Sequence, residues 1–224
     1  MKILYVGDVH GQFEELYKLL KTIDADIVCC VGDFGYWPNM RNYTIGVLKS
    51  YDNPIYWCDG NHEDFESLNK IWTDRVPTPI LDNVFYMPRG SHITVEGKNI
   101  LFMGGAESHD KMRRTPGYDW FPEEIISRAD IDALPNIEVD TVVSHTIPTY
   151  FKVGALASLD RGNDPSRPAL NLVFKKYKPR KWYAGHWHEY TIGDYEGCSW
   201  KALNTLPYNG EPKGYGINHW LEEI

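Results

Sequence analysis

The side chains best able to do chemistry stand in short motifs that follow apolar, strand-like runs. Each motif combines glycine or serine with carboxylate, amide or imidazole groups, which commonly bind metal ions. Because the carboxyl ends of parallel strands meet at one edge of a sheet, we expect these motifs to lie close together. They are Gly7–Gly11 (GDVHG), Gly32–Asp33, Gly60–Glu63 (GNHE), Ser144–His145 and Gly185–His188 (GHWH).

Oxygen ligands from Asp and Asn, mixed with imidazole nitrogens, favour Mn, Fe, Zn or Ni over Ca. His186 and His188 are two residues apart, so on a strand they face the same side. Each motif alone has an ordinary structural interpretation, because Gly-Asp and Asn-His are frequent in turns. The prediction of a metal site therefore depends on all the motifs occurring in order, each at the end of an expected strand.

Alternating strand-like and helical patterns position these motifs. Early strands are expected over residues 2–8, 27–33 and 54–61, separated by helices over 13–23, 44–51 and 64–72. Later strands are expected over 84–88, 92–97, 99–105, 141–146 and 181–188, with helices over 123–134 and 169–177 and several short strands between 190 and 220. We therefore expect one α/β domain over residues 1–224, in which two sheets pack face to face with helices outside.

Two long stretches, Ser108–Pro122 and Ala155–Pro168, fit no regular element and are rich in charge and in Gly or Pro. Loops of this size are usually functional or mobile. Basic side chains in the first loop could hold a phosphate oxygen, and aromatic ones could stack on a nucleobase. The alternative is that the basic residues, with Arg161 and Arg167 of the second loop, are solvated charges. The candidate substrate-binding residues are His109, Arg113, Arg114 and Tyr118.

Composition limits the partners and the location. A formal net charge of -8 disfavours generic nucleic-acid binding, although bound divalent cations would offset some carboxylates. The four cysteines show no zinc-like pair spacing. No signal peptide and no apolar run of membrane-spanning length is visible, so we expect a reduced, cytoplasmic protein with no membrane partner. The sequence does not indicate an oligomeric state.

Taken in order, GDVHG, GDFG, GNHE, SH and GHWH resemble the motif series of the calcineurin-like metallophosphoesterase superfamily. The segment from Gly104 to Glu124 also looks like small bacterial and phage phosphoesterases. The resemblance runs from Asp8 to His188, and GNHE and the paired histidines are its most specific parts. It implies a four-layer αββα sandwich of two mixed β-sheets flanked by helices, and a metal-dependent phosphate-ester hydrolase.

The resemblance further implies a site for two divalent ions, with Mn as first choice and Fe, Zn or Ni as alternatives. Such a pair clamps a phosphoryl group and binds the attacking hydroxide between the ions. Asp33 would bridge the ions, and His62 would stabilise the transition state or protonate the leaving oxygen. The first ion would be held by Asp8, His10 and His188, and the second by Asn61, His145 and His186.

The second motif departs from the GDxVDRG of Ser/Thr protein phosphatases, because Gly32–Trp37 reads GDFGYW. His62 consequently lacks its usual Asp partner. The arrangement is similar to phosphodiesterase branches, including RNA lariat debranching enzymes, which carry Cys where this chain has Asp8. We expect a preference for phosphodiesters of nucleotides or oligonucleotides, with phosphomonoesters, protein phosphatase substrates included, as the alternative. A non-catalytic metal-binding interaction module is disfavoured, because no ligand is missing.

Overall fold

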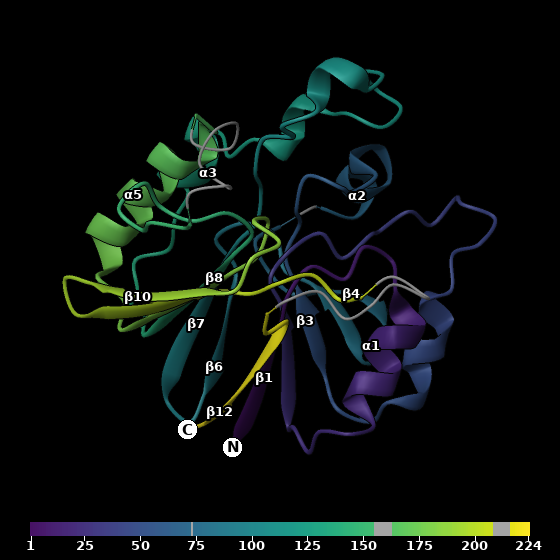
Figure 1. Ribbon diagram of the computed structural model, residues 1–224, viewed down its shortest axis with the longest axis horizontal. Coiled ribbons are helices and arrows are strands. Elements are labelled where there is room, and N and C mark those ends of the chain that lie inside the picture. The colour runs from purple at the N-terminus through teal and green to yellow at the C-terminus, as the bar shows by residue number, and fades with distance from the viewer. Residues whose placement is uncertain (73, 155–162, 208–215) are drawn as a thin grey trace.

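Two six-stranded sheets form the centre of the molecule (Figure 1). The computed structural model describes residues 1–72, 74–154, 163–207 and 216–224. The first sheet has the order β12-β1-β2-β3-β5-β4 and the second β10-β11-β9-β8-β7-β6. In both sheets the inner pairings are parallel and the outermost pairing on each side is antiparallel, so both sheets are mixed.

The strands of the first sheet are β1 (Lys2–Val6), β2 (Ile27–Cys30), β3 (Ile55–Trp57), β4 (Thr78–Leu81), β5 (Val84–Tyr86) and β12 (His219–Glu223). Those of the second are β6 (His92–Val95), β7 (Lys98–Met103), β8 (Thr141–Ser144), β9 (Lys181–Ala184), β10 (Thr191–Tyr195) and β11 (Cys198–Ala202). The helices are α1 (Phe13–Leu20), α2 (Phe65–Ile71), α3 (Arg128–Asp132) and α5 (Ser166–Tyr177), and the 3-10 helices are η1 (Ile45–Ser50), η2 (Lys111–Arg113) and η3 (Pro122–Glu124).

Side-chain alternation along the strands builds the layers. In β1, Ile3 and Tyr5 enter the core between the two sheets, whereas Leu4 and Val6 enter a core shared with α1, η1 and α2. A third core lies between the second sheet and helices α3 and α5. Figure 1 shows α1 and α5 on opposite sides of the sheets. The expected four-layer αββα sandwich of two mixed sheets is therefore confirmed.

The strands and helices agree with the sequence analysis except in a few places. The expected helix over residues 44–51 is the 3-10 helix η1. Strand β4 was not expected. It contains Pro79 and lies at a sheet edge, where a missing N–H is tolerated. Residue 73 and residues 155–162, with Arg161 among them, lie outside the described part of the chain.

The single helix expected over residues 123–134 is wrong. The segment instead forms η3, an extended turn at Ile125 and then α3, which begins behind a capping box of Ser127 and Asp130. The fully buried Arg89 side chain donates to the carbonyl oxygens of residues 123, 124 and 125, so these carbonyls are engaged outside a helix. A long-range contact therefore overrides the local helical pattern.

Candidate metal centre

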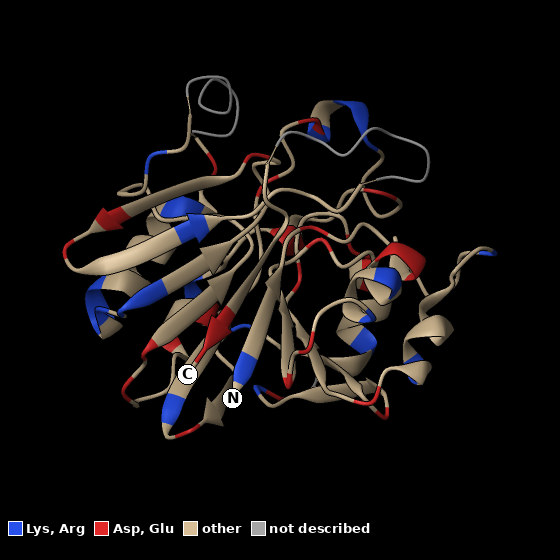
Figure 2. Ribbon diagram, turned by 60° about the horizontal axis from the view of Figure 1, so that its bottom comes forward, with Lys and Arg blue, Asp and Glu red and all other residues tan. Residues whose placement is uncertain are grey.

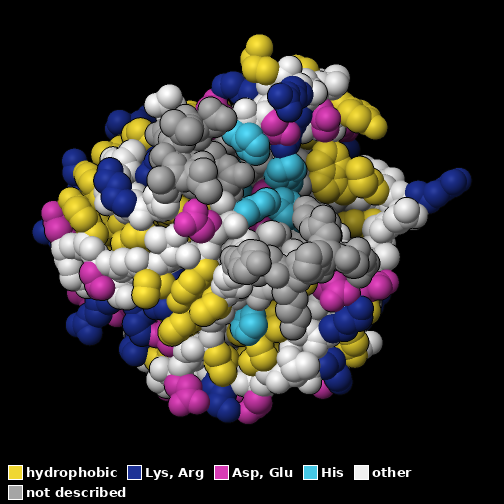
Figure 3. Space-filling model, in the orientation of Figure 1, with side chains coloured by type: hydrophobic (Ala, Val, Ile, Leu, Met, Phe, Trp, Pro, Cys, Tyr) yellow, Lys and Arg dark blue, Asp and Glu magenta, His cyan; other side chains and the backbone are white. Residues whose placement is uncertain are grey.

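The carboxyl ends of parallel strands from both sheets meet at one rim and carry the predicted ligands. Asp8, Asp33 and Asn61 follow β1, β2 and β3 of the first sheet, and His145 and His186 follow β8 and β9 of the second. Figure 3 shows histidine side chains gathered in a hollow near the middle of one face. In Figure 2, Asp and Glu also occur in the loops where the strands converge.

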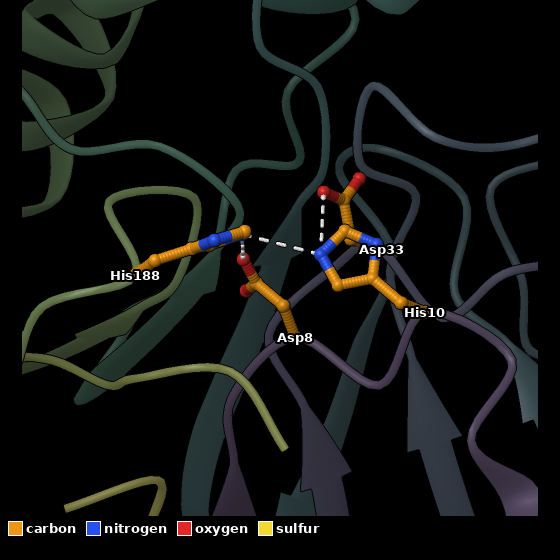
Figure 4. A group of neighbouring side chains, drawn as sticks. All are labelled: Asp8, His10, Asp33 and His188. Atoms are coloured by element: carbon orange, nitrogen blue, oxygen red, sulfur yellow. Dashed lines mark hydrogen bonds and ion pairs between the residues drawn. The ribbon is translucent and has the colours of Figure 1, made fainter. Parts of the chain in front are cut away.

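Four candidate ligands form a compact cluster, drawn in Figure 4: Asp8, His10, Asp33 and His188. Their ligand atoms all lie within 4.8 Å of one another. The Nε2 atoms of His10 and His188 are 3.2 Å apart. His188 Nε2 lies 3.2 Å from Asp8 Oδ2, and His10 Nε2 lies 3.6 Å from Asp33 Oδ2. The cluster offers two imidazole nitrogens and two carboxylates close together. Such a donor set fits a divalent transition metal.

A second set of candidate ligands lies next to the other oxygen of Asp33. His145 Nε2 lies 3.3 Å from Asp33 Oδ1 and 3.1 Å from Asn61 Oδ1. The Nδ1 of His145 faces the carbonyl oxygen of Val31 at 3.1 Å, so Nδ1 carries the hydrogen and Nε2 is the nitrogen available to a metal. The ring of His186 packs edge-on against that of His145, with centroids 4.9 Å apart. Oxygen and nitrogen atoms of these kinds are ligands that a divalent cation accepts, although among the described residues only Asp8, His10, Asp33 and His188 form the compact cluster.

The charges of the cluster are strongly coupled. Burial opposes ionisation of Asp33, but His145, His62 and His10 outweigh it and hold its pKa well below the usual range. Burial lowers the pKa of His145, but the Asp33 and Asp8 carboxylates outweigh this effect and raise it to about 9. A divalent cation bound here would compete with the proton on His145, because a metal binds imidazole in its neutral form.

Several candidate ligands have an unfavourable backbone conformation. His10, Asp33, His186 and His188 all have left-handed backbone conformations, with φ of 49°, 42°, 69° and 52°. Non-glycine residues adopt this region rarely, and they cluster at functional sites when the surrounding structure holds them there. Glycine is required beside them, because a Cβ at Gly60 would collide with the Asp33 carboxylate.

The sequence analysis did not identify two groups of residues that hold the candidate ligands in position. The buried Glu63 carboxylate accepts hydrogen bonds from the backbone N–H of Phe34, Gly35 and Tyr36 at 2.7, 3.0 and 2.5 Å. It thereby fixes the loop directly after Asp33. Its place in GNHE was the available signal, but the motif alone does not identify what the carboxylate binds.

The second group sets the orientation of the Asn61 amide. Asn61 Nδ2 donates to Ser108 Oγ at 3.1 Å, and Ser108 Oγ donates to Glu124 Oε2 at 2.8 Å. The Ser108 N–H and the Trp120 indole N–H also donate to Glu124, at 2.6 and 2.9 Å. Because its nitrogen is held by Ser108, Asn61 must turn Oδ1 toward His145. No sequence spacing indicates this chain of contacts.

The family model for calcineurin-like phosphoesterases matches residues 1–190. The chain belongs to this family. Among curated proteins, it is 25% identical over 260 residues to a lariat debranching enzyme of Drosophila melanogaster, covering 95% of this chain and 45% of the fly enzyme. It is 27% identical over 225 residues to the lariat debranching enzyme of Schizosaccharomyces pombe, covering 84% of this chain and 48% of the yeast enzyme. The chain thus spans about half the length of these relatives.

Solved structures of low sequence identity also align with this chain. Vps29 of Entamoeba histolytica is 13% identical with a TM-score of 0.44, covering 100% of this chain and 86% of that protein. A phosphopantetheinyl hydrolase of Mycobacterium tuberculosis is 14% identical with a TM-score of 0.47, covering 92% of this chain and 90% of that protein.

The predicted substrate side of the site contains His62 and Arg114. Arg114 Nη2 lies 2.9 Å from His62 Nε2, and its Nε pairs with Asp110 Oδ1 at 2.8 Å. Burial lowers the pKa of His62 to about 4, so its neutral ring can accept a hydrogen bond from the guanidinium. The His62 ring therefore has an arginine neighbour where protein phosphatases were expected to have an aspartate.

The other candidate substrate residues lie farther into solvent. Arg113 and His109 are exposed, and the Tyr118 side chain is 74% exposed. Arg167 is not the solvated loop charge that was one interpretation, because it lies buried at the start of α5. Its guanidinium donates to the carbonyl oxygens of residues 147, 148 and 151 and stacks over Trp187, at 5.0 Å from the ring centroid.

Among the described residues, no helix combines the length and apolar character that crossing a membrane requires.

Proposed function

We propose that this protein is a hydrolase of phosphate esters that works with two divalent metal ions. The observation that carries the proposal is the position of Asp33 between two sets of ligand atoms. Its Oδ2 faces His10 at 3.6 Å and its Oδ1 faces His145 at 3.3 Å. Asp8, His10 and His188 would hold one ion, Asn61, His145 and His186 the other, and Asp33 would bridge them.

When bound, two such ions would neutralise charge on a phosphoryl group and supply a nucleophilic water at neutral pH. The donor set suits Mn first, with Fe, Zn or Ni as alternatives. Arg114 would hold a phosphoryl oxygen, because its guanidinium contacts the His62 ring and so lies on the predicted substrate side of the site. His62 would stabilise the leaving oxygen, or give it a proton once the bound phosphate anion has raised the pKa of the ring.

The proposed substrates are phosphodiesters of nucleotides or oligonucleotides. Two observations favour them over phosphomonoesters. The curated relatives include lariat debranching enzymes, and the lariat branch is a phosphodiester. In addition, His62 has the Arg114 guanidinium as its neighbour rather than the aspartate expected of protein phosphatases.

The test is turnover of bis-p-nitrophenyl phosphate and p-nitrophenyl phosphate by protein freed of metal and then reconstituted with Mn²⁺. We expect hydrolysis that depends on the metal and is faster for the diester. Faster hydrolysis of the monoester would support a phosphomonoesterase instead. If the metal binds but neither ester is hydrolysed, the protein is a non-catalytic metal-binding module and the proposal is wrong.

A further inference from the structure

A hollow of about 480 Å³ lies directly beside the metal centre. Its wall on that side is formed by His10 and His62, and most of the remainder comes from the loop after Asp33. That loop contributes Trp37, Met40, Asn42 and Tyr43. Ligand sites in proteins commonly have volumes of about 300–1,000 Å³, with apolar and aromatic walls and a few polar groups. In Figure 3, hydrophobic side chains border the histidines on one side of the central hollow.

The aromatic walls of this hollow are held in place by the fold. The indole N–H of Trp37 donates to the carbonyl oxygen of His62 at 2.8 Å, which fixes the ring against the GNHE loop. The Tyr43 ring packs edge-on against Phe13 and Tyr36, with centroids 5.4 and 6.1 Å apart. An aromatic ring held in this way offers a stacking surface without losing much conformational entropy on binding.

The aromatic residues of the 108–122 loop are engaged differently. Trp120 donates to the buried Glu124 carboxylate, and Phe121 packs into the core of the first sheet. Tyr118 is 74% exposed. Rigid aromatic surface adjoining His10 and His62 therefore comes from the loop that contains Trp37 and Tyr43.

We propose that this hollow binds the nucleobase of a nucleoside phosphate ester whose phosphate lies at the metal centre. The inference rests on the proposed function for the position of the phosphate. A base is favoured because it is flat enough to stack on Trp37 and has polar edges that the Asn42 amide can contact. Met40 adds an adaptable apolar side chain, consistent with tolerance of different bases.

The test measures binding, so it does not depend on turnover. The probes are the 5′-phosphonate analogue of thymidine, whose P–C bond cannot be hydrolysed, and methylphosphonate, which lacks the nucleoside. Calorimetry on the Mn²⁺-loaded protein should give at least about tenfold tighter binding of the nucleoside phosphonate, since stacking on an aromatic side chain contributes strongly per base.

The variants separate stacking from the hydrogen bond to His62. Trp37→Leu should reduce the advantage of the nucleoside phosphonate by about five- to a hundredfold and leave methylphosphonate binding nearly unchanged. Trp37→Phe keeps a ring but loses the N–H, so it should retain most of the advantage. Trp220→Ala, on β12 away from this hollow, is the control for loss of a tryptophan and should change neither affinity.

Equal affinity of the wild-type protein for both probes would overturn the inference. So would an equal loss for both probes in Trp37→Leu, because Trp37 would then act only by holding the GNHE loop. A base-dependent affinity in a protein that hydrolyses neither nitrophenyl ester would reject the proposed function and leave the base site standing. Hydrolysis of those esters without base-dependent affinity would reject the base site and leave the proposed function standing.

Discussion

Asp33 is the residue on which the two proposed sets of metal ligands depend. Its carboxylate is buried, faces a histidine from each set and also accepts the backbone N–H of His62 at 2.9 Å. Burying a carboxylate is unfavourable unless cations or hydrogen-bond donors compensate it. The histidines compensate it in the metal-free protein, and two divalent ions would do so in the loaded enzyme.

Asp33→Ala should therefore abolish phosphoesterase activity and weaken both metals, because a shared ligand is lost. Elemental analysis of the purified variant after dialysis checks this, with Asp132→Ala as control. Asp132 pairs with Arg128 on the surface of α3, so its loss should leave the metal content unchanged. Two tightly held ions per chain in Asp33→Ala would contradict the bridging assignment.

In the proposed function, His62 acts on the substrate rather than on a metal. Its Nε2 faces Arg114 at 2.9 Å, and its ring lies edge-on to that of His10 with centroids 5.0 Å apart. His62→Asn should leave the metal content near normal and lower kcat by about 10²–10⁴-fold for an alkyl ester. For a p-nitrophenyl ester the loss should be smaller, since that leaving group needs no proton. Equal losses on both esters would show that His62 is not the acid.

At the scale of elements, the segment from Ser108 to Glu124 joins the metal centre to the surface. Its exposed part contains η2, and its buried part contains Glu124, which holds Ser108 and thereby Asn61. Arg89 fixes the end of the segment by donating to the carbonyl oxygens of residues 123 to 125. The segment is therefore more than a connector, and changes in it should reach the site.

Two adjacent arginines on this segment offer a matched comparison. Arg114 lies against His62, whereas Arg113 is exposed. Since a charge-assisted hydrogen bond contributes about 1.5–3 kcal/mol, Arg114→Ala should lower kcat/KM by about ten- to a hundredfold. Arg113→Ala should change it less than about twofold. Steady-state kinetics on a nucleotide diester decide this, and equal effects of the two variants would contradict the assignment.

The Glu124 carboxylate should make the second metal's affinity depend on pH. Burial raises its pKa to about 7, so it is ionised above that pH and protonated below it. The ionised form accepts two hydrogen bonds from Ser108 and one from Trp120, so the affinity should fall as the pH drops from about 8 to 6. Glu124→Gln removes this ionisation and should show a weaker affinity with a shallower pH dependence. Metal titrations at several pH values check this, and identical pH profiles would refute the linkage.

At the scale of the whole molecule, the candidate metal ligands join the two sheets. Asp8, Asp33 and Asn61 follow strands of the first sheet, and His145 and His186 follow strands of the second. Ions bound between them would therefore cross-link the two halves of the sandwich. Unfolding separates these ligands, so an ion should bind the folded state in preference to the unfolded one.

Removal of metal should accordingly lower the melting temperature. A ligand at about 100 times its Kd adds about 2.7 kcal/mol of stability, which corresponds to about 5–10 °C for a chain of this size. Differential scanning calorimetry with and without Mn²⁺ measures the shift, and Asp33→Ala should show little of it. An equal Mn²⁺-dependent shift in Asp33→Ala would place the stabilising ion elsewhere on the molecule.

The candidate metal ligands could be proposed from the sequence because the signals that mark them are local. Strand periodicity, a glycine at the turn and a ligand directly after it all lie within a few residues, as in Gly32–Asp33 and Gly185–His186. Parallel pairing then gathers the ends of such strands at one rim. The same local signals were sufficient for most of the strands and for two packed sheets with helices outside, but not for β4 or for the break between η3 and α3.

The residues that contact and orient the candidate metal ligands are known only from the tertiary structure. Asn61 is oriented by Ser108, which lies 47 residues away in the sequence, and the buried Arg89 unwinds an expected helix by binding its carbonyl oxygens. Trp37 and Tyr43 form walls beside His10 through contacts that follow no helical or strand period. Such contacts depend on how distant segments pack, and this packing is determined by burial and hydrogen bonding over the whole chain. Local sequence patterns therefore do not predict them.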